Sequence, residues 1–491
     1  MSQPASTLPE ALNDAVSDYK AGKLVEAEQL CEQIIAAHHD FFDALYLLAI
    51  VQSRQGKTKA ALANFDRALS LRPGHAMTHF NRGNALQSLK QSEDALVSYD
   101  CAIDIQPDLA LAHSNRGNTL QSLKRYKEAV ASYDRAIELQ PNYAVALYNR
   151  GLALHEMKRC KEAVASYERA IDLQPGFAEA HLNQAISRLL IGDFLRGWQE
   201  YEWRMDVKSP GNRKRTFHRP QWVGSENISG KTIFLHSEQG FGDTILFGRY
   251  IPLVAARGAR VILEVPLPLV ELMARVSGVS QIVRRGNAPP DFDIQCPLPS
   301  LPLAFGTRLE TIPSAVPYLR ASPEAAMNWD ARLGPKHRPR IGLAWSGEPT
   351  HAGDANRSIA LSSLLSLLDT GATFVSLQKD VRAADATVLQ GRSDLLDFRD
   401  DLKSFSDTAA LVSQLDLVIS VDTSVAHLAG ALAKPVWVLV PFVPDWRWQL
   451  DRDDSPWYPT ARVFRQDDAR NWVNVIARVH AALSEFVQSR L

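Results

Sequence analysis

The chain is poor in cysteine, with only Cys31, Cys101, Cys160 and Cys296 among its 491 residues and no Cys-x-x-Cys pair. This scarcity excludes a disulfide framework and a zinc site built on cysteine thiolates, and it suits a reducing compartment. No apolar run approaches the roughly 18 residues that span a bilayer. The first residues also lack the basic and then apolar pattern of a secretory signal. We therefore expect a cytoplasmic protein without a membrane span.

An excess of charge of either sign is also missing. The 54 Lys and Arg residues nearly balance 55 Asp and Glu residues, which leaves a formal net charge of −1. This balance argues against nucleic acid or an anionic membrane surface as the main partner. With 46% hydrophobic and 22% charged residues the composition is that of a globular protein. The length predicts about three domains.

Tryptophan is absent from the first two fifths of the chain, because all 10 tryptophans lie at or after Trp198. Before that point the sequence repeats itself every 34 residues. The period relates a set of prolines, a set of small residues and a set of aromatic residues: Pro73, Pro107, Pro141 and Pro175; Ala49, Gly83, Gly117, Gly151 and Ala185; and Phe65, Tyr99, Tyr133 and Tyr167. A 34-residue period with these landmarks is the tetratricopeptide pattern, in which each repeat is a helical hairpin.

Clear repeats cover residues 42–75, 76–109, 110–143 and 144–177. A degenerate unit precedes them and a partial unit follows, so the sequence predicts an α-solenoid over residues 1–205. The small residues let the paired helices approach closely, the aromatic residue fills the remaining space, and proline ends the second helix.

A column of asparagines recurs on the first helix of the hairpins: Asn81, Asn115, Asn149 and Asn183. An asparagine side chain both donates and accepts hydrogen bonds, so such a column is able to bind the backbone of an extended acceptor peptide whatever its sequence. The alternative is that these side chains form only local hydrogen bonds. The neighbouring arginines, Arg82, Arg116 and Arg150, fit a solvated or inter-repeat face better than an anion site.

Residues 206–229 are basic and rich in Pro and Gly, which favours a solvated linker. Strand and helix patterns then alternate, with a break after residue 322. Alternation of this kind predicts parallel sheets covered by helices, here as two Rossmann-like lobes over residues 230–322 and 338–491. A final helix near residues 472–487 is expected to cross back onto the first lobe.

Ligands in such folds lie at the carboxyl ends of the strands, and three loops in that position carry polar residues. Gly240, Gly242 and Asp243 follow the first strand of the first lobe. Arg357 and Lys379 follow two strands of the second lobe, where they can neutralise a diphosphate. The third loop holds Asp422, Thr423, Ser424 and His427, at a helix start that suits phosphate. Each residue has an ordinary structural alternative as a helix cap or surface side chain.

The tracts FGDTILFGRYIPL and VISVDTSVAHLAGALAKPVWVL resemble the ADP-heptose heptosyltransferases. The layout of repeats followed by two lobes is similar to the O-GlcNAc transferases. The resemblance implies a GT-B glycosyltransferase. It makes Asp243, on the acceptor-side lobe, the general base. It places Arg357, Asp422, Thr423, Ser424 and His427 at the nucleotide diphosphate of the donor. Ser424 stands where the heptosyltransferases have glycine, and ADP-heptose as donor does not carry over.

Two further features have competing interpretations. The pairs Asp291/Asp293 and Asp451/Asp453 match an Asp-x-Asp metal motif literally, although one opens a predicted strand and the other lies in a charged loop. The aromatic tract Trp446, Trp448, Trp457 and Tyr458 suits either stacking on a ligand or a core that joins the lobes. We favour the core and expect no metal.

The sequence thus predicts a metal-independent, inverting transferase, with a nucleotide sugar as donor, no cofactor and a protein docked by the repeats as acceptor. Two alternatives remain. One is a catalytically inactive scaffold that binds partners through the repeats. The other is a transferase that acts on a lipid-linked or polysaccharide sugar.

Overall fold

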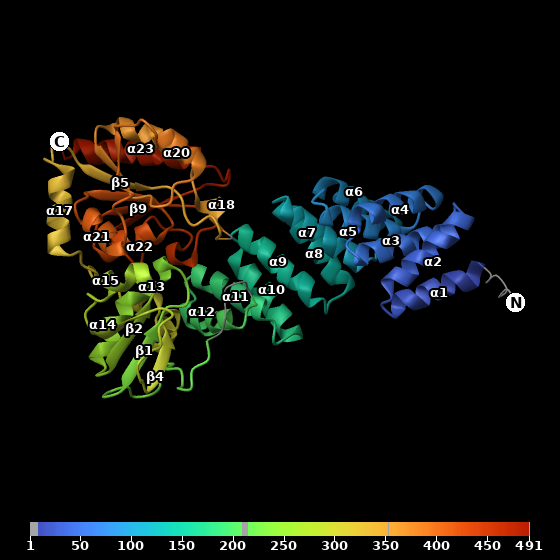
Figure 1. The fold of residues 1–491 in the computed structure, drawn as a ribbon, viewed down its shortest axis with the longest axis horizontal. Coiled ribbons are helices and arrows are strands. Elements are labelled where there is room, and N and C mark those ends of the chain that lie inside the picture. The colour runs from blue at the N-terminus through green and yellow to red at the C-terminus, as the bar shows by residue number, and fades with distance from the viewer. Residues whose placement is uncertain (1–7, 209–214, 352, 491) are drawn as a thin grey trace. The chain divides into compact units, whose positions relative to one another are not determined.

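A computed structural model describes residues 8–208, 215–351 and 353–490. The chain divides into two compact units, residues 1–183 and residues 184–491. Over residues 8–183 the secondary structure of the first unit is helical, and the second unit contains two sheets with their surrounding helices (Figure 1). None of the helices in the described ranges is long and apolar enough to cross a membrane.

The first unit is a series of antiparallel helix pairs. In chain order the helices are α1 (Leu8–Lys20), α2 (Leu24–Ala37), α3 (Phe42–Arg54), α4 (Thr58–Leu71), α5 (Ala76–Ser88), α6 (Ser92–Ile105), α7 (Ala110–Ser122), α8 (Tyr126–Leu139), α9 (Ala144–Glu156), α10 (Cys160–Leu173) and the start of α11 (Ala178–Leu190). The first helices of the four clear repeats begin at Phe42, Ala76, Ala110 and Ala144, so each repeat is one hairpin as predicted.

The small and aromatic positions interlock within each hairpin. A Cβ atom built on Gly117 would lie 2.6 Å from Cε1 of Tyr133, closer than any side chain tolerates. Both residues are buried, and Gly83 with Tyr99 repeats the arrangement. The small residue is therefore what allows the two helices to pack at this distance, as the sequence predicts.

The arginine column bridges neighbouring hairpins. Arg116 Nε donates to Oδ1 of Asp100 at 2.6 Å, and its Nη1 donates to Oγ of Ser132 at 2.7 Å. Asp100 belongs to the preceding repeat and Ser132 to the second helix of the same repeat. Arg82 and Arg150 make the equivalent pairs of bonds. The inter-repeat interpretation of this column is thus confirmed.

The second unit contains two sheets whose strand pairs are all parallel. The first sheet has the order β3-β2-β1-β4 and the second has the order β10-β9-β8-β5-β6-β7. The strands are β1 (Thr232–His236), β2 (Arg260–Val265), β3 (Val279–Arg284), β4 (Ile294–Pro297), β5 (Arg340–Ala344), β6 (Thr373–Ser376), β7 (Leu395–Asp397), β8 (Leu417–Val421), β9 (Val436–Val440) and β10 (Ala461–Arg465). The prediction of an α/β architecture with parallel sheets is confirmed.

The α-helices around these sheets are mostly short. They are α12 (Phe194–Tyr201), α13 (Phe241–Phe247), α14 (Ile251–Ala256), α15 (Val270–Met273), α16 (Leu301–Ala304), α17 (Pro323–Leu333), α18 (Asp354–Arg357), α19 (Leu361–Leu364), α20 (Ala383–Leu389), α21 (Phe405–Ser413), α22 (Ser424–Ala431) and α23 (Val473–Gln488). The expectation that the final helix returns to the first lobe is wrong. Helix α23 buries Val475, Val479 and Leu483 in the core of the second sheet, because its apolar residues recur every four positions on one face.

An aromatic core joins the two sheets of this unit. The ring of Trp198, on α12, lies 5.1 Å from Trp446, 6.4 Å from Trp457 and 6.5 Å from Phe247, measured between ring centroids. Trp446, Trp448, Trp457 and Tyr458 are each at most 2% exposed. The interpretation of the aromatic tract as a core is therefore the one that the structure supports. The same packing places α12 in the second unit, whereas the sequence extended the solenoid to residue 205.

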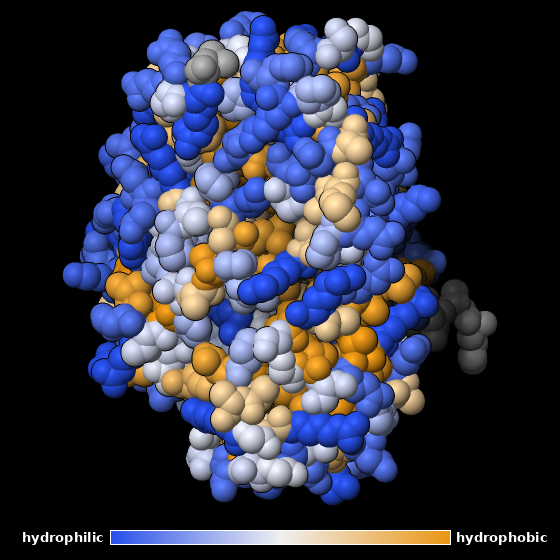
Figure 2. Space-filling view, turned by 90° about the vertical axis from the view of Figure 1, so that its left-hand side faces the viewer, coloured by the Kyte–Doolittle hydropathy of each residue, from blue (hydrophilic) through white to orange (hydrophobic). Residues whose placement is uncertain are grey.

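The predicted linker is solvated only in part. Residues 209–214 lie outside the described ranges. From Arg215 onward the segment packs on the first sheet: Arg215 pairs with the fully buried Glu264, and the ring of Phe217 lies 5.7 Å from that of Phe234. One of its basic residues, Arg215, therefore serves a buried partner. Figure 2 shows one face of the molecule, where hydrophilic residues predominate and apolar residues are exposed between them near the middle.

Candidate functional site

The loops that follow β1 and β8 lie against each other. Helices α13 and α22, which begin from these loops, are in contact. A Cβ atom on Gly242 would lie 2.9 Å from Cδ2 of His427, so the approach of the two loops requires a glycine at this position. The site lies where the carboxyl ends of the two sheets face each other.

Asp243 is held from both sides at this point. Its Oδ2 accepts a hydrogen bond from the backbone N–H of Gly240 at 3.0 Å, which caps the start of α13. Its Oδ1 is paired with the guanidinium of Arg447. Arg447 is 6% exposed, lies over the ring of Trp446 and donates to Oδ1 of Asp445 at 2.7 Å. Asp243 is therefore both a helix cap and an ion-pair partner of the second lobe.

The sequence reasoning did not single out Arg447 or Asp445 as site residues. The available signal was the tract Asp445-Trp-Arg-Trp448, which follows the strand β9 and mixes charged with aromatic residues. We call Asp243, Asp422, His427, Asp445 and Arg447 the acid–base cluster.

Asp422 directly follows the buried strand β8 and lies inside this cluster. Its side chain is 13% exposed. Burial, and after it the charge of Asp445, raise the pKa of Asp422 to about 6. The guanidinium groups of Arg447 and Arg357 act in the opposite direction. A carboxyl group with this pKa exchanges its proton close to physiological pH.

His427 lies one turn into α22, beside Asp422. Its Nδ1 is 3.0 Å from the hydroxyl of Tyr458, and its Nε2 is 3.8 Å from Oδ1 of Asp422. Burial, followed by the charge of Arg447, lowers the pKa of His427 well below its ordinary value. The imidazole is therefore neutral at pH 7 and serves as a hydrogen-bonding group rather than a cation.

The candidate donor-binding residues come together, with one exception. Arg357 Nη1 donates to the backbone oxygen of Asp422 at 2.9 Å. Thr423 is the residue before α22 and its Oγ1 lies 3.1 Å from Oγ of Ser420, while Ser424 is the first residue of the helix. Lys379 does not join them, because its Nζ donates to the backbone oxygen of Arg399 and its side chain is exposed.

The asparagine column of the solenoid forms hydrogen bonds between repeats. Each Nδ2 atom donates to an oxygen in the preceding repeat: Asn81 to the Tyr46 hydroxyl (3.0 Å), Asn115 to Asn84 Oδ1 (2.8 Å), Asn149 to Asn118 Oδ1 (2.9 Å) and Asn183 to the Tyr148 hydroxyl (3.1 Å). The local alternative therefore accounts for one amide hydrogen of Asn81, Asn115 and Asn149, and for both of Asn183, whose Nδ2 also donates to the backbone oxygen of Glu179 at 2.8 Å. Peptide binding by this column stays a prediction.

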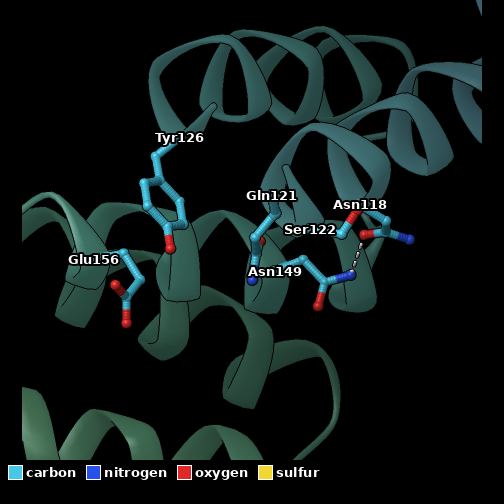
Figure 3. A pocket seen from close by; sticks show the side chains of 6 residues that line it. All are labelled: Asn118, Gln121, Ser122, Tyr126, Asn149 and Glu156. Atoms are coloured by element: carbon cyan, nitrogen blue, oxygen red, sulfur yellow. Dashed lines mark hydrogen bonds between the residues drawn. The ribbon is translucent and has the colours of Figure 1, made fainter. Parts of the chain in front are cut away.

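One member of the column also borders a pocket. Figure 3 shows this pocket of about 360 Å³, which is lined by Asn118, Gln121, Ser122, Tyr126, Asn149 and Glu156. The sequence reasoning missed Asn118, Gln121 and Ser122. They follow Asn115 at three, six and seven positions on helix α7, a spacing that places residues on one face and could have identified them.

One residue of each Asp-x-Asp pair accepts a hydrogen bond from a backbone N–H group. Asp293 Oδ2 accepts a hydrogen bond from the backbone N–H of Thr232 at 2.7 Å. The backbone oxygen of Asp453 accepts a hydrogen bond from the backbone N–H of Val463, also at 2.7 Å. Among residues 8–208, 215–351 and 353–490, no group of three or more His, Cys, Asp or Glu side chains is placed to hold a metal ion.

Comparisons with known proteins identify the first unit. Models described as tetratricopeptide repeat match residues 13–76, 46–110 and 108–176, which confirms the predicted repeats and indicates a protein or peptide partner. Protein FlbA of Caulobacter vibrioides is 25% identical over 338 residues, covering 62% of this chain and 55% of FlbA. The chain thus spans about half the length of that relative.

Two solved structures are similar to part of this chain. A tetratricopeptide repeat protein of Parabacteroides merdae is 21% identical, and the match covers 41% of this chain and 80% of that protein, with a TM-score of 0.37. A thermophilic TPR protein of Thermus thermophilus is 23% identical, and the match covers 37% of this chain and 100% of that protein, with a TM-score of 0.31.

Replacing Asp422 by asparagine is expected to stabilise the ligand-free protein at pH 7 by on the order of 1–3 kcal/mol. The folded-state pKa of about 6 lies above the ordinary value of 3.8. The carboxyl group therefore contributes stability that is complete below pH 3.8 and is lost as the pH rises through 6. Asparagine does not ionise, so the Asp422→Asn variant avoids that loss.

Urea unfolding followed by tryptophan fluorescence checks this, because every tryptophan lies in the second unit. The advantage of the variant should grow as the pH rises to about 6 and stay constant above it. Asp400→Asn, at an exposed position of the same lobe, is the control and should shift nothing. A variant less stable than the parent at pH 7 would contradict the expectation.

Proposed function

We propose that this chain is a glycosyltransferase of the GT-B type, which transfers a sugar from a nucleotide-sugar donor to a hydroxyl group of an acceptor. The observation that carries the proposal is the acid–base cluster, formed where the carboxyl ends of two parallel sheets face each other. The resemblance of the two tracts that contain Asp243 and Asp422 to the heptosyltransferases supports it independently. The first sheet and its loops hold the acceptor, and the second holds the donor.

The chemistry divides between the two lobes. As the bond to the sugar breaks, negative charge grows on the departing nucleotide diphosphate. The free N–H groups at the start of α22 and the guanidinium of Arg357 stabilise that charge without a metal ion. The acceptor hydroxyl loses its proton as it attacks the sugar, and Asp243 accepts that proton. Asp243 is able to accept the proton once the guanidinium of Arg447 moves away from its Oδ1 or binds it together with the acceptor.

The acceptor is a protein docked by the repeats. Tetratricopeptide repeats indicate a protein or peptide partner. The pocket bordered by Asn118 and Asn149 supplies amide, hydroxyl and carboxylate groups within the solenoid. Polar groups of this kind hold an extended peptide through its backbone.

A second candidate function is an interaction scaffold whose transferase half is inactive. The ion pair between Arg447 and Asp243 favours it, because the guanidinium occupies one oxygen of the candidate base. A scaffold would capture its partner through the repeats equally well after substitution of Asp243 and Asp422. An enzyme that modifies a glycan is the third candidate, and mass spectrometry of proteins and surface glycans from a deletion strain distinguishes the two acceptors.

Thermal denaturation with a panel of nucleotide sugars tests the proposal. A donor that binds only the folded chain stabilises it by about 2.7 kcal/mol at one hundred times its dissociation constant. We expect one nucleotide family to raise the melting temperature and its sugar to be slowly hydrolysed. If no member of the panel binds or is hydrolysed by a folded preparation, the transferase proposal is wrong and the scaffold stands.

A further inference from the structure

Two arginines in the second lobe share one buried carboxylate. Asp354, which begins α18, is 4% exposed. Its Oδ2 pairs with Nη2 of Arg382, and its Oδ1 lies 3.6 Å from Nε of Arg357. Arg357 and Arg382 come from the loops after β5 and β6, so Asp354 holds two guanidinium groups together at the carboxyl edge of the second sheet.

A serine completes the arrangement. Ser358 Oγ donates to Oδ1 of Asp354 at 2.8 Å and accepts a hydrogen bond from Nη2 of Arg382 at 3.1 Å. It also accepts the backbone N–H of Gly347 at 3.0 Å, which ties the loop after β5 to the same group. The two arginines are therefore fixed relative to each other and to the backbone.

Polar atoms at this place have no hydrogen-bond partner within the described ranges of the chain. They include the buried Oγ of Ser346, which is a 4% exposed residue, and the buried Nε atom of Arg382. Buried polar atoms are nearly always paired in folded proteins, so their grouping in one place points to a ligand that completes the site.

The local charge favours an anion. Within this group Arg357 and Arg382 carry two positive charges and Asp354 carries one negative charge, while the carboxyl group of Asp422, whose pKa Arg357 lowers, lies next to the group. Arg357 also donates to the backbone oxygen of Asp422, so this group borders the start of α22, where N–H groups attract phosphate. The side chains of Arg357 and Arg382 are 19% and 37% exposed, which leaves both accessible from solvent.

We propose that Arg382 is a second anion-binding residue and that Arg357 and Arg382 together clamp the diphosphate of a nucleoside diphosphate. One planar guanidinium matches one phosphate group, and two of them held by one carboxylate match two. Asp354 is a positioning residue, since it reaches the ligand only through the arginines. The inference rests on the proposed function and names the part of the donor that gives its binding strength.

Titration calorimetry of the full chain tests the clamp. The probes are ADP, GDP, UDP and CDP and the matching monophosphates. For the base that binds best, we expect the parent to prefer the diphosphate at least tenfold. Arg382→Gln should bring that preference down by about tenfold and leave the affinity for the monophosphate nearly unchanged.

The control variant is Arg392→Gln, which removes an arginine from another carboxylate pair of the same lobe, with Asp394. It should keep the preference of the parent. Asp354→Asn should lower the preference for the diphosphate as Arg382→Gln does. A merely structural Asp354 would instead weaken the diphosphate and the monophosphate equally, which would overturn its positioning role.

The outcomes separate this inference from the proposed function. An unchanged preference in Arg382→Gln, together with diphosphate binding by the parent, overturns the clamp and leaves the transferase proposal standing. Binding of no nucleotide by the folded parent overturns both. The melting temperature of each ligand-free variant, measured alongside, shows that a lost preference does not come from unfolding.

Discussion

Replacing Trp198 by alanine is expected to lower the free energy of unfolding of the second unit by about 3–5 kcal/mol. Trp198 is 1% exposed, and its ring contacts aromatic residues from both lobes of that unit, Phe247 of the first lobe and Trp446 with Trp457 of the second. Alanine leaves a cavity between the sheets that neither side can fill without moving. Because the cavity lies between the lobes, the acid–base cluster should loosen as well.

The nine remaining tryptophans all lie in the second unit, so their fluorescence during denaturant unfolding reports on that unit alone. The matched control is Met327→Ala, which removes a long apolar side chain that is 67% exposed on α17. It should change stability by less than about 0.5 kcal/mol. A Trp198→Ala protein with the stability of the control would show that the aromatic core does not hold the sheets together.

The Asp243→Asn variant is expected to lose about 10²- to 10⁴-fold in sugar transfer while it keeps donor binding. Asparagine retains the size of the side chain but cannot accept the proton of the acceptor hydroxyl. The donor contacts lie in the other lobe, at Arg357 and the start of α22. Measurement of turnover and of donor affinity on the same preparation therefore separates the two roles.

Asp291→Asn is the control, since it removes an exposed carboxylate from the same lobe and from the literal Asp-x-Asp pair. It should transfer sugar at the rate of the parent, and so should the parent after treatment with a chelator. Unchanged turnover in Asp243→Asn would exclude this residue as the base. Equal loss of donor binding and turnover would show that its pairing with Arg447 is structural.

The sequence alone predicted the parts whose cause is local. The 34-residue period is repeated four times, and each repeat buries the same small and aromatic residues, so hairpins such as α7 with α8 follow directly from the pattern. Buried strands such as β5 and β8 follow from short apolar runs. The loops after them could be selected because ligands of parallel sheets bind at that edge.

In the solenoid, the sequence pattern alone does not decide the function of the asparagine column. The spacing identified Asn115 and Asn149, but their partners in the preceding repeat depend on how neighbouring hairpins stack. The same spacing cannot separate a column that binds peptide from one that ties repeats together. The structure supplies the ties between repeats for all members of the column.

Tertiary structure alone decided which distant residues meet. Asp243 and Arg447 are 204 positions apart and form an ion pair, and Asp354 joins Arg382 across 28 positions. The sequence does not show which carboxylate pairs with which guanidinium when the two are far apart, because many such pairs are chemically possible. The packing of the folded chain decides which pair forms. The same holds for helix α23. Its apolar face could be predicted from the sequence, but the surface that this face covers depends on the shape of both sheets. The sequence determined the helices and strands and the edge of the sheets at which polar site residues lie. Tertiary packing determined which charged side chains face one another at that edge.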